Sequence, residues 1–227
     1  MPVITDTTSD DTPSVSSAIA DASTSEDAAY SYNASSNFSV DGDTLTYSAT
    51  LSSGSALPSW LSINSSTGVL SGTPENGDVG KITIKVTTTD TSDASISDTY
   101  TLTVNNSNDT PTVSTTISNS STNEDVAYSY DTSSHFSDAD VGDTLTYSAT
   151  LSNASALPSW LSIDTTTGIL SGTPANTDIG AINVTVTATD IASASISDTY
   201  TITVNNVNYD PTGSVTITGD AKTGQTL

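Results

Sequence analysis

The feature that most constrains the fold is an internal duplication. Residues 42–106 and 142–206 carry nearly the same sequence, with no insertion in either copy. Strings such as DTLTYSATLS and SALPSWLSI recur letter for letter. A period of about 100 residues is too long for a solenoid repeat and matches one small all-β domain per copy. The duplication therefore predicts two domains in tandem.

The two copies differ in one acidic segment just upstream of the duplication. The second copy reads FSDADVGD from Phe136, whereas the first reads only FSVDGD from Phe38. A two-residue gap thus removes an Asp-x-Asp pair from the first copy. This segment is where the units differ in chemistry.

The charge balance excludes several classes of partner. The chain has 26 acidic residues against three lysines and no arginine, for a formal net charge of -23. Nucleic acid and anionic lipid both require a basic surface, so neither is an expected partner. Concentrated carboxylates favour a divalent cation as the neutralising group. There is no cysteine for disulfides or thiolate metal sites.

Alternating apolar and polar residues predict strands with one buried face. This period of two occurs in three segments of each copy, and threonine fills many outward positions. Gly68 and Gly168 stand where a hairpin turn needs a positive φ. We expect Trp60 and Trp160 to anchor the core between two sheets. The alternating segments are 45–51, 82–86 and 100–104, with 145–151, 182–186 and 200–204.

These patterns predict an all-β chain of two tandem antiparallel β-sandwiches. The expected divisions are a tail at 1–11, domains at 12–108 and 109–208, and a linker with the start of a truncated further domain at 209–227. No apolar run approaches the roughly 20 residues of a membrane span, and no signal peptide follows Met1. We therefore expect a fragment of a longer protein that does not insert into membranes.

One motif resembles a known family. The run LPSWLSIxxxTGxLSGTP, followed by a strand ending in Thr89-Asp90 or Thr189-Asp190, is similar to the dystroglycan-type cadherin-like repeats of bacterial surface adhesins. The resemblance implies Ig-like, cadherin-like sandwiches strung head to tail outside the cell. It also implies calcium at domain junctions, as in many cadherin-related proteins.

The resemblance further implies a set of calcium ligands. Cadherin-type sites combine an early acid, an Asn/Asp linker, an Asp-x-Asp pair and a late Asp. Calcium accepts six to eight oxygen ligands at about 2.3–2.6 Å, which suits these side chains. Glu124, Asp125 and Asn208 are further candidate ligands, for a second site at the junction that follows the second repeat. The expected ligands between the repeats are Glu26, Asp27, Asn106, Asn108, Asp109, Asp138, Asp140 and Asp190.

The expected function is that of an extracellular adhesive spacer stiffened by Ca²⁺, with neighbouring repeats of a longer chain as partners. Catalysis has little support, because one histidine and no cysteine or arginine leave few ways to build a nucleophilic site. A carbohydrate-binding module is the alternative, since two tryptophans and nine tyrosines could serve as sugar platforms. Binding to cell-surface glycan and self-association through threonine-lined strand edges also stay open.

Overall fold

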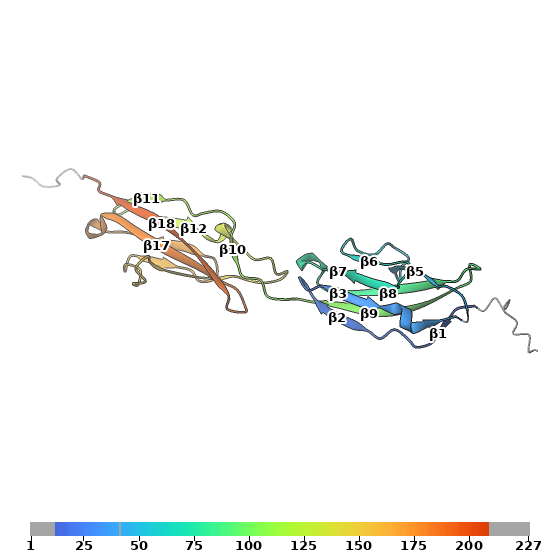
Figure 1. The fold of residues 1–227 in the computed structure, drawn as a ribbon. Helices are drawn as coiled ribbons and strands as arrows, with labels where there is room; N and C mark the ends of the chain where they lie inside the picture. The colour runs from blue at the N-terminus through green and yellow to red at the C-terminus, as the bar shows by residue number, and fades with distance from the viewer. Residues whose placement is uncertain (1–11, 41, 209–227) are drawn as a thin grey trace, which may run out of the picture. The chain divides into compact units, whose positions relative to one another are not determined.

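The protein is all-β and folds as two compact units (Figure 1). Each unit contains most of one repeat, and residues 137–145 and 189–196 of the second repeat group with the first unit. The computed structural model describes residues 12–40 and 42–208. Within these ranges the only helices are four short 3-10 turns. None of them is long and apolar enough to cross a membrane. The expected tail at 1–11 and the expected further domain at 209–227 lie outside the described residues.

The described residues of the first repeat form nine strands and two 3-10 turns. The turns are η1 (Ala34–Asn37) and η2 (Asn76–Asp78). The strands are β1 (Ser14–Val15), β2 (Ala22–Ser25), β3 (Tyr30–Asn33), β4 (Phe38–Ser39), β5 (Thr46–Leu51), β6 (Leu61–Ile63), β7 (Val69–Gly72), β8 (Gly80–Thr89) and β9 (Ser95–Asn105).

The second repeat contains the same elements in the same order. Its turns are η3 (Ser133–His135) and η4 (Asn176–Asp178). Its strands are β10 (Thr112–Val113), β11 (Ser120–Asn123), β12 (Tyr128–Asp131), β13 (Phe136–Ser137), β14 (Thr146–Leu151), β15 (Leu161–Ile163), β16 (Ile169–Gly172), β17 (Gly180–Thr189) and β18 (Ser195–Asn205).

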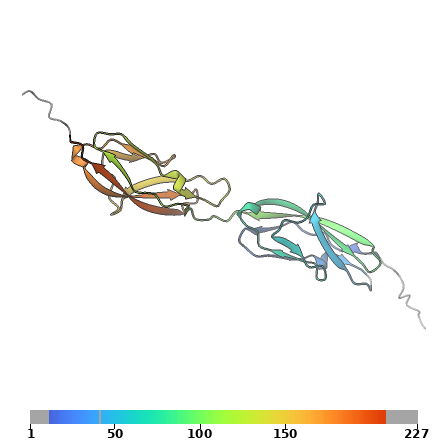
Figure 2. The same cartoon turned by 90° about the horizontal axis from the view of Figure 1, so that it is seen from above.

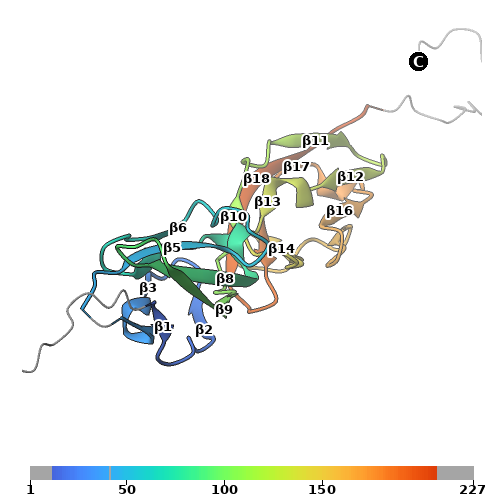
Figure 3. The same cartoon turned by 90° about the vertical axis from the view of Figure 1, so that its right-hand side faces the viewer.

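Each repeat is a sandwich of a four-stranded and a three-stranded sheet, seen from two directions in Figures 1 and 2. The larger sheets have the orders β2-β9-β8-β5 and β11-β18-β17-β14, the second of which can be followed by its labels in Figure 3. The smaller sheets are β3-β7-β6 and β12-β16-β15. Each repeat also has a two-stranded sheet of short strands, β1-β4 in the first and β10-β13 in the second. The predicted sandwich is therefore confirmed.

One pairing in each repeat departs from the antiparallel expectation. Strand β2 runs parallel to β9, with Ala22 opposite Leu102 and Ser25 opposite Asn105. Strand β11 pairs with β18 in the same way. The other pairs whose register is known are antiparallel, including the long β8–β9 hairpin.

The core follows the period-two pattern of the sequence. Ile84, Val86, Tyr100 and Leu102 alternate inward from the β8–β9 hairpin and are almost wholly buried. Trp60 is only half-buried and packs against this cluster from its margin, so the expectation of a central anchor was wrong in degree. Its bulk explains this position, because an indole of that size is seldom fully enclosed in a thin sandwich.

The turns also agree with the sequence. Gly68 and Gly168 have φ values of 68° and 69°, as their hairpins require. Asn64 and Asp164 begin these turns by accepting hydrogen bonds from the backbone two and three residues on.

Candidate metal centre

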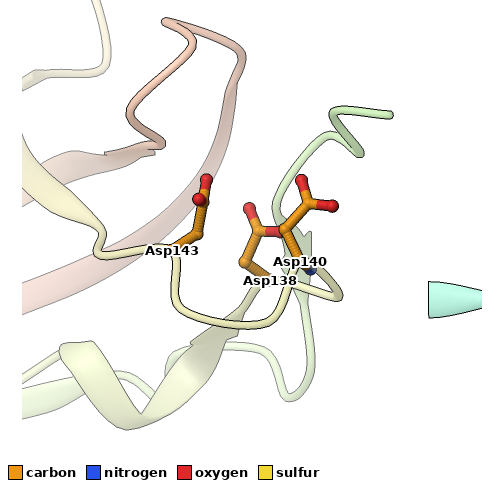
Figure 4. Close-up of side chains that lie close together, drawn as sticks. All are labelled: Asp138, Asp140 and Asp143. Atoms are coloured by element: carbon orange, nitrogen blue, oxygen red, sulfur yellow. The ribbon is translucent and has the colours of Figure 1, made fainter. Parts of the chain in front are cut away.

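Three carboxylates gather on the loop between β13 and β14 of the second repeat. Asp138, Asp140 and Asp143 each offer an oxygen, and these oxygens lie within 4.8 Å of one another. Figure 4 shows their side chains projecting to the same side of the curved loop. In the described part of the chain, no other group of three acidic, histidine or cysteine side chains meets in this way.

The loop is held in shape by its own hydrogen bonds. The Asp140 amide donates to Oδ1 of Asp138 at 3.0 Å, and the Asp143 amide donates to the Asp140 carbonyl oxygen at 3.2 Å. These bonds bend the backbone so that residues two and five positions after Asp138 turn back toward one another. Local sequence thus creates the cluster.

Each of the three carboxylates keeps one oxygen that is buried and unmatched. Oδ2 of Asp138, Oδ1 of Asp140 and Oδ2 of Asp143 are shielded from solvent and accept no hydrogen bond from the described residues. Shielding anionic oxygens without partners is costly, so a cation would relieve the arrangement.

Asp190 and the linker residues adjoin this loop. Oδ1 of Asp190 accepts from the Ala194 amide at 2.8 Å, and Oδ2 accepts from Nδ2 of Asn108 at 2.9 Å. The Asp109 amide donates to Oδ2 of Asp140 at 2.8 Å. Five of the eight expected ligands are therefore connected to one another: Asn108, Asp109, Asp138, Asp140 and Asp190.

The pKa of Asp143 reflects the negative charges of the cluster. Partial burial raises the pKa of its carboxyl, and the negative charges of Asp140, Asp138 and Asp190 raise it further. A hydrogen bond from the Ile191 backbone opposes this shift. A carboxyl whose pKa is raised by like charges lies in a negative potential that would attract a cation.

The remaining expected ligands do not join the cluster by any hydrogen bond. Glu26 is 2% exposed, and its Oε1 accepts from the Ser107 amide at 2.7 Å while Oε2 is buried without a partner. Asp27 is exposed at a φ of 57°, and Asn106 is exposed on the linker. Glu26 therefore contacts the linker backbone beside Asn108.

A similar buried glutamate binds the backbone at the end of the second repeat. Glu124 is 1% exposed, its Oε1 accepts from the Val207 amide at 2.8 Å, and its Oε2 is buried and unmatched. Asp125 and Asn208, the other residues considered for an exit site, are exposed. Both repeats thus use one buried glutamate to hold the chain that follows them.

The equivalent pole of the first repeat has a different arrangement. Asp90 is buried, and its Oδ1 accepts from the Ser92 amide and hydroxyl and from the Ala94 amide, while its Oδ2 is buried and unmatched. Burial alone would raise the pKa of Asp90, but these hydrogen bonds hold it below its usual value. Asp43 accepts from the Thr91 hydroxyl at 3.1 Å, and Asp41 lies outside the described residues.

Asp143 was absent from the expected ligands, although it belongs to the acidic run that distinguishes the second repeat. Its spacing from Asp140 does not match the Asp-x-Asp motif, so the motif gave no reason to include it. The acidic run FSDADVGD was the signal that could have identified it.

All candidate ligands are oxygen donors. Carboxylates, an asparagine amide and backbone carbonyls suit a hard cation such as Ca²⁺, whose coordination tolerates irregular loops. The acid cluster and its unmatched oxygens therefore fit Ca²⁺.

A family model described as a putative Ig domain matches the chain twice, over residues 12–105 and 110–205. No curated protein is similar enough in sequence to be counted as a relative.

Solved cadherin structures share the fold. A mouse Cadherin-23 EC22-24 structure is 20% identical, with a TM-score of 0.58 over 87% of this chain and 66% of that one. Human CDH23 EC21-23 is 17% identical, with a TM-score of 0.56 over 82% and 67%. An endo-fucoidan hydrolase of glycoside hydrolase family 107 is 25% identical over 88% of this chain, but the chain spans only 30% of its length. Its TM-score of 0.39 is too low to carry an argument about activity.

Proposed function

The chain belongs to the putative Ig domain family, and from that premise we propose that it is an extracellular spacer whose linker is stiffened by Ca²⁺. Tandem Ig-like and cadherin-like repeats are generally extracellular adhesion modules. The finer assignment, a calcium-dependent segment of a surface adhesin or matrix protein, rests on the acid cluster. We propose domain boundaries at 12–108 and 109–208 with it.

The observation that carries the proposal is the set of unmatched carboxylate oxygens on the 138–143 loop. The three negatively charged carboxylates repel one another, and one oxygen of each is shielded from the solvent that would weaken this repulsion. Bound Ca²⁺ would supply the positive charge that this loop lacks. We assign Asp138, Asp140, Asp143 and Asp190 as the carboxylates that would hold it.

The linker would be restrained through the same residues. Asp109 already donates its amide to Asp140, and Asn108 donates its side chain to Asp190. Each linker residue keeps oxygen atoms that could serve a cation. Occupation of the loop would therefore fix the course of the chain at 108–109, while Glu26 holds the Ser107 amide.

Calorimetric titration with Ca²⁺ tests the assignment. We expect the wild-type chain to bind, and the double variant Asp138→Asn with Asp140→Asn to lose measurable binding. The matched control is Asp43→Asn with Asp90→Asn in the first repeat, which should leave the affinity unchanged. Equal affinity in the wild type and the Asp138/Asp140 variant would refute the ligand assignment.

Small-angle scattering tests the stiffening separately. We expect the distribution of maximum dimensions to narrow when Ca²⁺ replaces chelator. Indistinguishable profiles from a chain that binds Ca²⁺ would leave a cation site without the proposed effect on the linker. The carbohydrate-binding alternative stays a prediction, which titration with neutral and acidic oligosaccharides would test.

A further inference from the structure

The turn η2 contains the only Asn-Gly dipeptide of the chain, at Asn76 and Gly77. Gly77 is exposed, and no atom outside its neighbours lies within 4 Å of where a Cβ would stand. Glycine places no side chain over its own amide nitrogen, so that nitrogen can approach the preceding asparagine more freely than in any other dipeptide. A three-residue 3-10 turn also restrains the backbone less than a long helix does.

From this geometry we propose that Asn76 is a site of spontaneous deamidation, and that its aspartate product tightens cation binding at the 138–143 loop, to which Asp109 is hydrogen-bonded. The Gly77 nitrogen attacks Cγ of Asn76, a C–N bond forms, and the Cγ–Nδ2 bond breaks. Nδ2 leaves as ammonia with the proton from the Gly77 amide. Water then opens the succinimide, giving aspartate when it adds at Cγ and isoaspartate when it adds at the backbone carbonyl carbon. The chemistry needs only water.

The environment of Asn76 gives the conversion a consequence. Its Nδ2 donates to Oδ2 of Asp109 at 2.7 Å, and its Oδ1 is buried without a hydrogen-bond partner. Deamidation to aspartate replaces the donor by a second carboxylate oxygen. Without a cation, two anionic oxygens would then face each other where a hydrogen bond had been, and the contact between η2 and Asp109 would be lost.

In the presence of a divalent cation, the added carboxylate should stabilise the contact between η2 and Asp109 instead of disrupting it. The new carboxylate adds one negative charge beside Asp109, whose amide is bonded to the acid cluster through Asp140. Calcium affinity rises with the number of charged ligands, so the aged chain should bind Ca²⁺ more tightly and depend on it more. This second step rests on the proposed calcium site, whereas the deamidation itself does not.

The second repeat supplies a matched internal control. Turn η4 occupies the same place and begins with Asn176, but Thr177 follows it. The threonine side chain is branched at Cβ and crowds the amide nitrogen that would have to attack. Both asparagines therefore share a turn and differ in the residue that follows. They also differ in surroundings, because Asn76 is half-buried and bonded to Asp109 whereas Asn176 is exposed, so the substitutions at Gly77 and Thr177 carry the test.

Mass spectrometry of peptides from protein incubated at mildly alkaline pH tests the first step. We expect the amide-to-acid mass change at Asn76 on the order of tenfold faster than at Asn176. Gly77→Thr should abolish the difference, and its backbone is free of the left-handed strain that would make this change unfavourable. Thr177→Gly should create the reaction at Asn176. Equal rates at Asn76 in the wild type and Gly77→Thr would overturn the proposal.

Calcium titration of Asn76→Asp tests the second step. We expect Ca²⁺ binding on the order of tenfold tighter than in the wild type, from one added charge near the cation. The control Asn176→Asp should change nothing. Unchanged or weaker binding by Asn76→Asp would refute the tightening. A wild type that binds no Ca²⁺ would refute the proposed function and this step, while leaving the mass-spectrometric result to decide the deamidation.

Discussion

The two repeats are alike in their interiors and unlike at one pole. Leu70 and Leu170 are both fully buried, and Tyr100 and Tyr200 are each 2% exposed. By contrast, Asp90 of the first repeat accepts three hydrogen bonds on Oδ1 within its own loop and keeps one buried, unmatched oxygen, Oδ2, whereas the 138–143 loop gathers three carboxylates that each keep such an oxygen. The difference teaches that one sandwich can carry either a single hydrogen-bonded carboxylate or a cluster of three carboxylates at this pole, since the core does not depend on the choice.

The largest effects should come from the shared interior. Leu70→Ala and Leu170→Ala each remove a wholly buried side chain, and each should lower the free energy of unfolding of its own repeat by about 2–5 kcal/mol. Urea denaturation of each repeat, with and without its substitution, measures the two losses in free energy of unfolding. Losses that differ by more than the experimental error would break the comparison, because the two cores would then not be equivalent.

A loop exchange should move the cation dependence from one repeat to the other. Replacing residues 40–42 by the sequence of 138–142 should give the first repeat a Ca²⁺-dependent rise in stability. The rise is about 2.7 kcal/mol when free Ca²⁺ is 100 times its dissociation constant. The reciprocal exchange should remove such a rise from the second repeat. Thermal unfolding with Ca²⁺ and with chelator measures it, and a first repeat that stays indifferent would show that the loop alone is insufficient.

Removing one of the crowded charges should have a smaller effect. In chelator, Asp143→Asn should raise the melting temperature of the second repeat at neutral pH, because the pKa of Asp143 is raised by burial and by its acidic neighbours. A raised carboxyl pKa means that ionisation opposes folding, so the benefit should fade as pH falls through that pKa. Asp43→Asn is the control. A fall in the melting temperature would contradict the expected repulsion.

The smallest effect concerns acid stability. Asp164 accepts hydrogen bonds from the Thr167 and Thr166 amides, which lower the pKa of its carboxyl, whereas Asn64 makes the same turn with a neutral amide. The stabilisation from ionised Asp164 is present above its unfolded pKa and is lost as pH falls through the lower folded value. Asp164→Asn should therefore make the acid unfolding of the second repeat shallower, as followed by circular dichroism. An unchanged profile would assign the pH dependence to other acids.

The period-two pattern was sufficient to predict the sandwich, because alternation reports which face of a strand is buried. It could not report pairing direction, so the parallel β2–β9 and β11–β18 pairs were missed. Alternation in a single strand is the same for both directions. Trp60 was placed too deep for a related reason, since a sequence does not state how thick the core is.

The acid cluster was predictable in part. The Asp-x-Asp motif identified Asp138 and Asp140, which lie together on one loop. Asp143 and the buried state of Glu26 were not predicted, because they depend on how the backbone folds back: the Asp143 amide bonds to the Asp140 carbonyl oxygen, and the Ser107 amide bonds to the Glu26 carboxylate. Such contacts between distant or bent segments have no signature in residue spacing.

The parallel pairing of β2 with β9 has a consequence for a chain that is stretched. Because these strands run in the same direction, the chain enters a repeat at one end of the pair and leaves at the other. Tension on the two ends, once the two-residue β1 has peeled away, would drag β2 and β9 past each other lengthwise. The ladder from Ala22 to Ser25, with the Glu26 amide bound to the Asn105 carbonyl, would then be loaded in shear and would have to break together. Each repeat thus has a parallel strand pair whose hydrogen bonds resist a lengthwise pull together. An antiparallel pair opened from its end resists less, because its hydrogen bonds break one at a time.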